Sequence, residues 1–204
     1  MWAWLFLLAP ALAARHELTF EAGTTVISDP AASTWFGAGG EPQLGLRIGG
    51  AVLQHPTGFG LVVGGAWGRQ AQAGYVTPSY STLDGEYLQS DIRTRLLVDR
   101  FGLGLRADYD VRGVFFPLVR AEARLALVSW RLDESELGLR GAGVAPGGRF
   151  TGGFEVMIPD RALPVTVGFT LEAGYEIDAP AKLGQLGTID PSGPVVTAGG
   201  GLRL

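Results

Sequence analysis

The most constraining feature of this chain is a strict alternation of apolar and polar residues that runs along nearly its whole length. Within residues 165–177, Val165 and Leu171 fall on one face of an extended strand, whereas Thr166 and Glu172 fall on the other. A β-strand separates such sets completely, and a helix would mix them. Glycine, which occurs 32 times in 204 residues, costs a helix interior about 1 kcal/mol per residue relative to alanine. The sequence therefore predicts a single all-β domain.

Ten segments carry the alternation, and Gly, Pro and Asp residues typical of turns separate them. Most of these segments are close to the roughly 9–11 residues that a tilted strand needs to cross a bilayer, and they exceed the roughly 5–6 residues of an ordinary strand. This length favours a membrane-spanning barrel. The predicted strands are residues 16–27, 43–54, 59–70, 86–98, 102–112, 118–131, 136–143, 147–158, 164–177 and 194–204.

The connections between these strands differ in length, and this difference favours ten strands over eight. Bacterial outer-membrane barrels have short periplasmic turns and longer external loops. With ten strands and a periplasmic N-terminus, the long connections 28–42, 71–85 and 178–193 lie outside, and the short connections 55–58, 99–101, 132–135 and 159–163 face the periplasm. Eight strands, formed by merging neighbouring segments, are the alternative.

The choice of the face that points inward separates a membrane barrel from a soluble, lipocalin-like barrel. Charged residues make up only 18% of the chain, whereas soluble surfaces usually carry about 25–35%. Small residues that suit a narrow interior crowd the polar face, at Gly23, Gly45, Gly49, Gly60, Gly64, Gly104, Gly153, Gly168, Gly174, Gly199 and Gly201. Aromatic residues gather near strand ends, as in membrane girdles, at Trp67, Tyr87, Phe101, Phe115, Phe116, Trp130, Phe150 and Tyr175. We therefore expect a closed antiparallel transmembrane β-barrel with its apolar face outward.

The first thirteen residues have the pattern of a secretory signal peptide. An unbroken apolar stretch leads to Pro10, and residues 11–13 (Ala-Leu-Ala) match the small-x-small cleavage pattern. The stretch is too short to cross a bilayer, which takes about 20 apolar residues. The sequence thus predicts a signal peptide at 1–13 and an exported barrel domain at 14–204. No cysteine is present, so neither a disulfide nor a lipid anchor on cysteine is available.

The chain resembles the small bacterial outer-membrane β-barrels of the outer-membrane-protein-A-like or W-like type. The resemblance rests on the N-terminal apolar segment, on the alternation and on the last strand, whose alternate positions are Val196, Ala198, Gly200, Leu202 and Leu204. In those families the assembly machinery reads the last strand, which usually ends in an aromatic residue; Leu204 departs from that pattern. The resemblance implies an outer-membrane location, contact with membrane lipid and lipopolysaccharide, and recognition by the barrel-assembly machinery. It implies no particular activity.

The polar face would enclose many charged side chains in the lumen. They are Glu17, Glu21, Arg47, Asp91, Arg93, Arg95, Arg106, Asp108, Asp110, Arg112, Arg120, Glu122, Arg124, Arg140, Arg149, Glu155, Glu172, Glu176 and Arg203. Segments 86–98, 102–112 and 118–131 are rich in arginine, whereas segments 16–27 and 164–177 are mostly acidic. Because unpaired buried charge costs several kcal/mol, we expect ion pairs across the lumen. These pairs would occlude it and leave a structural or binding role. A narrow transport pore is one alternative, and a soluble periplasmic barrel that binds an apolar ligand is the other.

Catalytic, metal and cofactor sites are not indicated. The two histidines lie outside the expected external rim, His16 near the mature N-terminus and His55 in a predicted periplasmic turn. Asp108 and Asp110 share a strand face, but the arginines beside them at 106 and 112 favour ion pairing over catalysis. No zinc signature is present, and no helix follows the loop glycines to form a phosphate cradle. We expect a protein that is not an enzyme and binds no cofactor.

Aromatic residues in two long connections are candidates for binding at the rim of the barrel. Trp35 and Phe36 lie in the connection 28–42, and Tyr75 and Tyr80 lie in the connection 71–85. Exposed aromatics on a rigid scaffold can contact lipopolysaccharide, a partner protein or a small apolar ligand. The interpretation we prefer is that they anchor the loops at the membrane interface. The net charge of −4 does not favour nucleic acid, and we expect a monomer.

Overall fold

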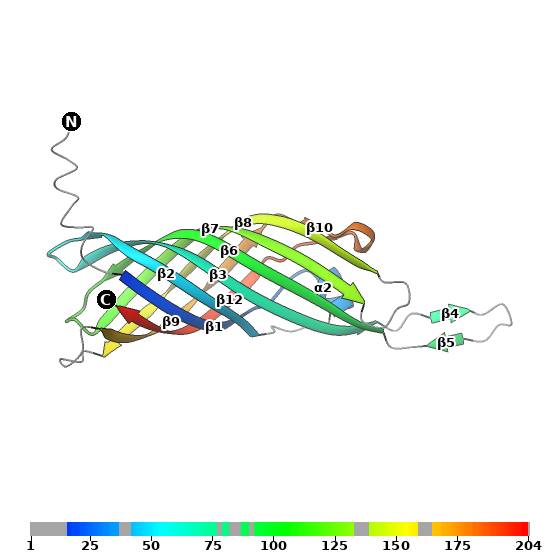
Figure 1. Cartoon of the computed structure of the whole chain (residues 1–204), viewed down its shortest axis with the longest axis horizontal. Coiled ribbons are helices and arrows are strands. Elements are labelled where there is room, and N and C mark those ends of the chain that lie inside the picture. The colour runs from blue at the N-terminus through cyan, green and yellow to red at the C-terminus, as the bar shows by residue number, and fades with distance from the viewer. Residues whose placement is uncertain are drawn as a thin grey trace, which may run out of the picture.

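A closed antiparallel barrel dominates the structure, a computed structural model that describes residues 16–36, 42–76, 79–81, 87–89, 92–132, 139–158 and 165–203. Among these residues, eight strands close in the order β1-β12-β9-β8-β7-β6-β3-β2, with β1 paired to β2 (Figure 1). The strands are β1 (His16–Thr25), β2 (Pro42–Gln54), β3 (Phe59–Val76), β6 (Ile92–Tyr109), β7 (Phe115–Leu132), β8 (Arg140–Ile158), β9 (Thr166–Asp178) and β12 (Gly193–Arg203).

The remaining elements are short and lie in the connections. They are the helix α2 (Pro30–Phe36), the hairpin strands β4 (Ser79–Ser81) and β5 (Tyr87–Gln89), the strands β10 (Ala181–Lys182) and β11 (Thr188–Ile189), and the 3₁₀ helix η1 (Gly184–Leu186). Within the described ranges, no helix has the length and apolar character needed to cross a membrane.

The barrel has eight strands, so the preference for ten was wrong and the alternative of eight is confirmed. Residues 92–98 and 102–109, from two predicted strands, belong to one strand, β6, and residues 140–143 and 147–158, from two others, belong to β8. Asp99 to Phe101 form no turn, because they continue the register with Arg69 to Trp67 on β3. Likewise, Ala145 to Gly147 stay paired with β7.

Two described turns lie at the end of the barrel where β1 begins and β12 ends, which we call the terminal end (Figure 1). In the first turn the His55 amide donates to the Phe59 carbonyl at 2.8 Å, and Gly58 takes a φ of 94° that favours glycine. The second turn spans residues 110–114, where the sequence predicted a strand end, and the Asp110 amide donates to the Gly58 carbonyl at 2.8 Å. The predicted connection 132–135 instead follows the opposite end of β7, which we call the loop end.

Four neighbouring strands are longer than the others. β3, β6 and β7 have 18 residues and β8 has 19, whereas β1, β2, β9 and β12 have 10 to 13. At the loop end the long strands therefore continue as a four-stranded sheet, the extension (residues 70–76, 92–98, 128–132 and 140–143). The helix α2 packs against β3 and β6, and β10 and η1 pack against β8, so folded-in connections cover the inner face of the extension.

The outer face of the barrel below the extension is apolar. Leu103 is 73% exposed and Phe20 is 61% exposed, whereas a soluble barrel would hide such side chains. A strand rises about 3.3 Å per residue and tilts by about 40° in such barrels, so residues 59–69 of β3 span about 25 Å of height. This is the height of the apolar band of outer-membrane barrels. We call this surface the belt; other exposed members are Leu44, Ile48, Val63, Leu105, Val119, Phe150, Phe169 and Val196.

Candidate functional site: a charged lumen below an apolar plug

The interior at the level of the belt holds arginines and carboxylates in nearly equal number. Most are less than a tenth exposed, and they arise because the inward positions of every strand alternate with the belt residues. The arginines are Arg47, Arg100, Arg106, Arg120, Arg124, Arg149 and Arg203, and the carboxylates are Glu17, Glu21, Asp108, Glu122, Glu155, Glu172, Glu176 and Asp178. Their contacts divide them into three tiers along the barrel axis.

The lower tier, nearest the terminal end, is centred on Arg106 and Arg203. Arg106 Nη2 lies 2.8 Å from Glu17 Oε2 and 2.8 Å from Asp108 Oδ2. Arg203, on the closing strand β12, forms a salt bridge with Glu155. Its guanidinium carbon also lies 4.5 Å from the centre of the Phe116 ring. The tier therefore ties β1, β6, β7, β8 and β12 together across the lumen.

The middle tier is centred on Glu172 of β9, which is 1% exposed. Arg120 Nη2 lies 2.9 Å from Glu172 Oε1, and Arg47 Nη1 lies 3.2 Å from the same oxygen. Arg47 also lies 2.8 Å from Glu21 and 3.1 Å from Glu122. One carboxylate thus receives two guanidinium groups from strands on different sides of the barrel.

The upper tier surrounds Glu176, which is fully buried. Arg100 Nε lies 3.0 Å from Glu176 Oε2, and Arg124 forms a salt bridge with the other carboxylate oxygen. Arg100 also donates to Gln70 Oε1 at 2.9 Å. Arg149 donates to the Thr197 hydroxyl at 3.0 Å, so this tier reaches β12 as well.

An apolar cluster, which we call the plug, closes the lumen above the upper tier. Phe36 of α2 is 1% exposed, and the Trp130 indole N–H donates to the Leu183 carbonyl at 3.0 Å. The plug consists of Ile27, Ala32, Phe36, Leu96, Val98, Ala126, Val128, Trp130, Ala145, Ala181, Leu183 and Ile189. The interior therefore changes from ionic to apolar between Arg100 and Val98, two successive inward positions of β6.

Glycines on inward positions let neighbouring strands approach closely. A Cβ atom placed on Gly174 of β9 would lie 1.9 Å from the Phe150 carbonyl oxygen of β8, which is shorter than any real contact of a Cβ atom. The dense packing of the tiers therefore depends on small residues between the charged ones.

Most of the residues that the sequence assigns to the lumen lie in the three tiers, but several do not. Arg93, Arg95 and Arg140 are exposed on the outer face of the extension, so their assignment to the lumen was wrong. At this level Leu96 and Val98 are apolar and face inward to the plug. The alternate positions of β6, which carry Arg93 and Arg95, therefore face outward.

Two further assignments to the lumen were wrong because the strand ends earlier than predicted. Arg112 is exposed in the turn at the terminal end, and Asp110 in the same turn accepts a hydrogen bond from the Gly113 amide. Asp108 is therefore separated from Asp110 and is held by Arg106. Asp91 lies outside the described residues.

Two lumen residues escaped the sequence analysis. Arg100 stood in the predicted turn 99–101, and Asp178 stood in the predicted loop 178–193. The even-numbered positions of β6 face inward without interruption from Val98 to Asp108, and this unbroken parity was the signal for Arg100. Asp99 hid it, because an acidic residue on the apolar face suggested a turn. In the structure Arg69 Nε donates to Asp99 Oδ1 at 2.7 Å and neutralises this charge.

The candidate rim aromatics do not form one exposed group. Phe36 is buried in the plug, and Trp35 packs against it. Tyr75 is 66% exposed on the outer face of β3, and Tyr80 lies in β4. Trp35 and Phe36 therefore hold α2 inside the lumen. This corrects both the expectation that they are exposed for binding at the rim and the preferred interpretation that they anchor the loop at the membrane interface.

The structure places most of the named residues of the last strand, and both histidines. On β12, Val196 and Leu202 are exposed in the belt together with Gly200, Ala198 is half-buried, and Leu204 lies outside the described residues. His16 is exposed at the start of β1, and His55 Nδ1 lies 2.8 Å from the Thr57 hydroxyl in the turn. In the part of the chain that the structure describes, no group of three or more histidine or acidic side chains could hold a metal ion.

Comparison with solved structures finds bacterial outer-membrane barrels with a similar fold. Ail, the attachment invasion locus protein of Yersinia pestis, solved in complex with the heparin analogue sucrose octasulfate, is 10% identical, with 94% of this chain and 99% of Ail covered and a TM-score of 0.49. Neisserial surface protein A is 16% identical, with 93% and 96% covered and a TM-score of 0.48. A major outer membrane protein from Thermus thermophilus is 10% identical, with 93% and 99% covered and a TM-score of 0.47.

No protein-family profile matches the chain, and no curated protein matches it in sequence. The chain is a small outer-membrane-type β-barrel of eight strands, and its exposed belt and ionic interior have the polarity that such barrels require.

Proposed function

We propose that this chain is an outer-membrane β-barrel with a structural or binding role and a lumen closed to solutes. The terminal end faces the periplasm and the loop end faces outward, which agrees with short turns at one end and longer connections at the other. The proposed role is not enzymatic. In support, Asp108 is held by Arg106, and both histidines lie at the terminal end.

The observation that carries this proposal is the stacking of three ionic tiers below the plug. Eight strands leave an interior that side chains alone can fill, whereas open aqueous channels appear near sixteen strands. A solute would have to displace paired charges such as Arg106–Glu17 and Arg120–Glu172 in succession. Separating such buried pairs costs several kcal/mol per ion.

Conductance in a planar bilayer tests the closed lumen. The refolded full chain is expected to give no steady current, because a solute would have to separate the paired charges of all three tiers. Folding of each sample is checked by the faster gel migration of the unheated barrel. Steady single-channel steps of nanosiemens scale would overturn the proposal and favour the narrow transport pore.

A variant with an opened plug tests whether the tiers alone close the lumen. Replacing residues 30–36 with a glycine–serine segment removes α2 and opens the plug, but it leaves all three tiers in place. We expect this variant to stay closed as well. If this variant conducts while the unmodified chain does not, the tiers do not seal the lumen, and the three ionic tiers no longer support the proposal.

Export and assembly complete the proposal. Removal of residues 1–13 leaves a barrel domain at 14–204 that is a monomer in contact with outer-membrane lipid and lipopolysaccharide, and the assembly machinery reads β12. Its support is the pattern of residues 1–13 and the outward row of Val196, Gly200 and Leu202. Cell-envelope fractionation and N-terminal sequencing of the recovered protein test it. Recovery in the soluble fraction, or a retained Met1, would contradict it.

A further inference from the structure

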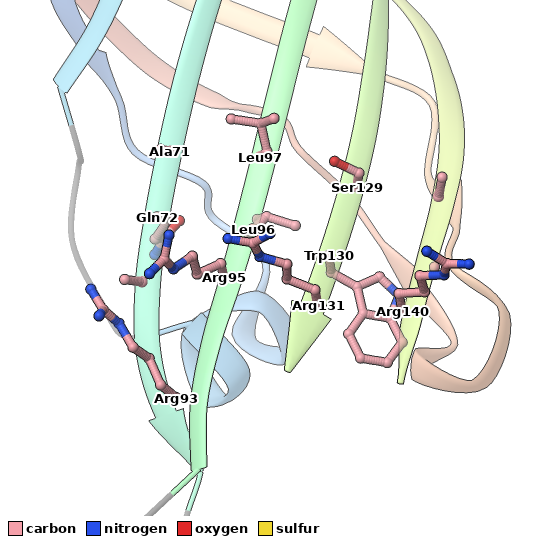
Figure 2. Close-up of a pocket in the computed structure, with 13 residues that line it drawn as sticks. Ala71, Gln72, Arg93, Arg95, Leu96, Leu97, Ser129, Trp130, Arg131 and Arg140 are labelled. Carbon is pink, nitrogen blue, oxygen red and sulfur yellow. The ribbon is translucent and has the colours of Figure 1, made fainter. Parts of the chain in front are cut away.

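Four arginines form a row on the outer face of the extension. Arg95 of β6 pairs in register with Arg131 of β7, which pairs with Arg140 of β8, and Arg93 follows two residues beyond Arg95. All four side chains are exposed. Figure 2 shows them together at the ends of three neighbouring strands, with Leu97 further along β6 toward the barrel.

A groove lies beside this row on the outer face of the extension. The groove has a volume of about 820 Å³, and the arginines line it together with the outward residues Ala71, Ala73, Leu97 and Ala142. Small side chains form its floor, so an elongated molecule can lie against the sheet. The end of the groove nearer the belt is therefore lined by small or apolar side chains and the other end is cationic, so an anionic molecule can lie along the groove with its charges at the row.

The described part of this outer face carries no carboxylate nearer the row than Asp99. Both oxygens of Asp99 accept from Arg69, at 2.7 Å and 3.0 Å, so this carboxylate is already matched. Among the described residues, Arg93 and Arg140 form no salt bridge. Guanidinium groups bind phosphate through two parallel hydrogen bonds, which makes phosphate the favoured anion.

The height of the row selects the kind of phosphate. The Arg69–Asp99 pair marks the loop-end edge of the belt, and Arg95 lies four residues beyond Asp99, which corresponds to about 10 Å along the barrel axis. The phosphate of a phospholipid lies next to the hydrocarbon edge, well below this level. A phosphate carried on the sugars of a glycolipid headgroup reaches it.

We propose that the arginine row binds the phosphorylated sugar headgroup of an outer-leaflet glycolipid, whose sugars extend along the groove toward the belt. This site rests on the membrane orientation given under the proposed function. Arg95 and Arg140 are two strands apart, or about 10 Å at their backbones, so the row spans more than one phosphate group. The barrel thus presents a fixed cationic surface to the charged layer above the hydrocarbon.

Binding in detergent micelles tests the site. The full chain is refolded in a non-ionic detergent and titrated with lipopolysaccharide that carries phosphorylated core sugars, with the same preparation after chemical dephosphorylation, and with phosphatidylglycerol. We expect the phosphorylated glycolipid to bind at least tenfold more tightly than either of the others. Free inorganic phosphate serves as the competitor that separates a lipid site from a simple anion site.

The variant Arg93→Gln/Arg140→Gln removes two charges without breaking a described salt bridge. It is expected to lose about tenfold in affinity for the phosphorylated glycolipid, since each lost charge-assisted hydrogen bond weakens binding substantially. The matched control Arg112→Gln/Lys182→Gln removes two exposed charges outside the groove and is expected to bind as the unmodified chain does. Asp91 and Asp133, which flank the strand ends in the sequence, stay unchanged in both variants.

Three results would overturn the proposal. One is equal affinity of the Arg93→Gln/Arg140→Gln variant and the control. Another is equal binding of the phosphorylated and dephosphorylated glycolipid, and the third is displacement of the glycolipid by inorganic phosphate at matched concentration. Conductance of the same samples reports separately on the closed lumen, so a failure of this site is distinguishable from a failure of the proposed function.

Discussion

The barrel within the belt and the extension at the loop end follow opposite rules of polarity. In the belt region of β6, Leu103 faces outward and Arg106 faces inward. In the extension of the same strand, Leu96 faces inward and Arg95 faces outward. The backbone is one continuous strand and the parity never changes. The polarity of a face is therefore set by what lies beyond it: hydrocarbon outside the belt, and the folded-in connections inside the extension.

The two regions also differ in what fills them. Ion pairs in the belt region connect strands that are far apart in the sequence, such as Arg47 and Glu172. The extension is filled by α2 and by residues 181–189, which pack apolar side chains against β3, β6 and β8. The first filling depends on charge pairing, whereas the second depends on burial of apolar surface. The predictions below separate these two dependences.

The largest effect is expected for Glu172→Gln in the middle tier. The change leaves the guanidinium groups of Arg47 and Arg120 without their shared charge, and breaking a buried pair in this way costs about 3–5 kcal/mol. The free energy of unfolding in urea, followed by tryptophan fluorescence in lipid vesicles, measures it. A loss no greater than that caused by Asp99→Asn on the outer face would show that the tier does not stabilise the barrel.

The next effect is expected for Phe36→Ala in the plug. Truncating a buried phenylalanine costs about 3 kcal/mol, and here the loss falls on the docking of α2 and not on the barrel. Hydrogen exchange should speed up in residues 30–36 and 181–189, with β1 and β12 unchanged. Thr34→Ala, an exposed position of the same helix, is the control. Equal acceleration across all strands would mean that the plug and the barrel unfold together.

A smaller effect is expected for Leu103→Arg, which places a charge in the belt. Arginine on the lipid face near mid-bilayer costs about 2 kcal/mol or more, and the cost falls to about 0–1 kcal/mol near the interface. The matched change Ala142→Arg lies on the outer face of the extension and should be nearly neutral. Urea midpoints of both variants in vesicles give the comparison. Similar losses for the two would place the extension inside the hydrocarbon.

The smallest effect is expected for Asp99→Asn at the boundary of the two regions. The Arg69 side chain is 53% exposed, and exposed ion pairs contribute less than about 1 kcal/mol. The change should lower the free energy of unfolding by less than that amount, and raising the salt concentration should reduce the difference between variant and unmodified chain. A loss of several kcal/mol would show that this pair is shielded from solvent.

The local pattern predicted a strand and its inward face correctly wherever hydrocarbon lies outside the strand and charged side chains lie inside. The alternation around Glu172 and Glu176 predicts β9 nearly residue by residue, because each outward position meets hydrocarbon and each inward position meets charge. It failed at Arg93 and Arg95, where the polar positions face outward. Nothing local to residues 92–98 distinguishes the two cases, since α2 and residues 181–189 arrive from distant parts of the chain.

The number of strands was predicted less well for a related reason. Asp99 to Phe101 and Ala145 to Gly147 have the composition of turns, and they stay in strands because paired neighbours hold them. The Arg69–Asp99 salt bridge removes the cost of a charge on the outer face. Such compensation comes from another strand and cannot be read within either segment.

The sequence by itself determined that the chain forms strands, that these strands are long enough to cross a membrane, and that charged and apolar side chains fall on opposite faces. Those properties follow from the period of two in the backbone, which each segment carries alone. Only the tertiary structure decided the closure at eight strands, the three tiers of ion pairs and the reversal of polarity in the extension. These depend on which distant side chains meet, because burial and charge pairing are properties of neighbours in space.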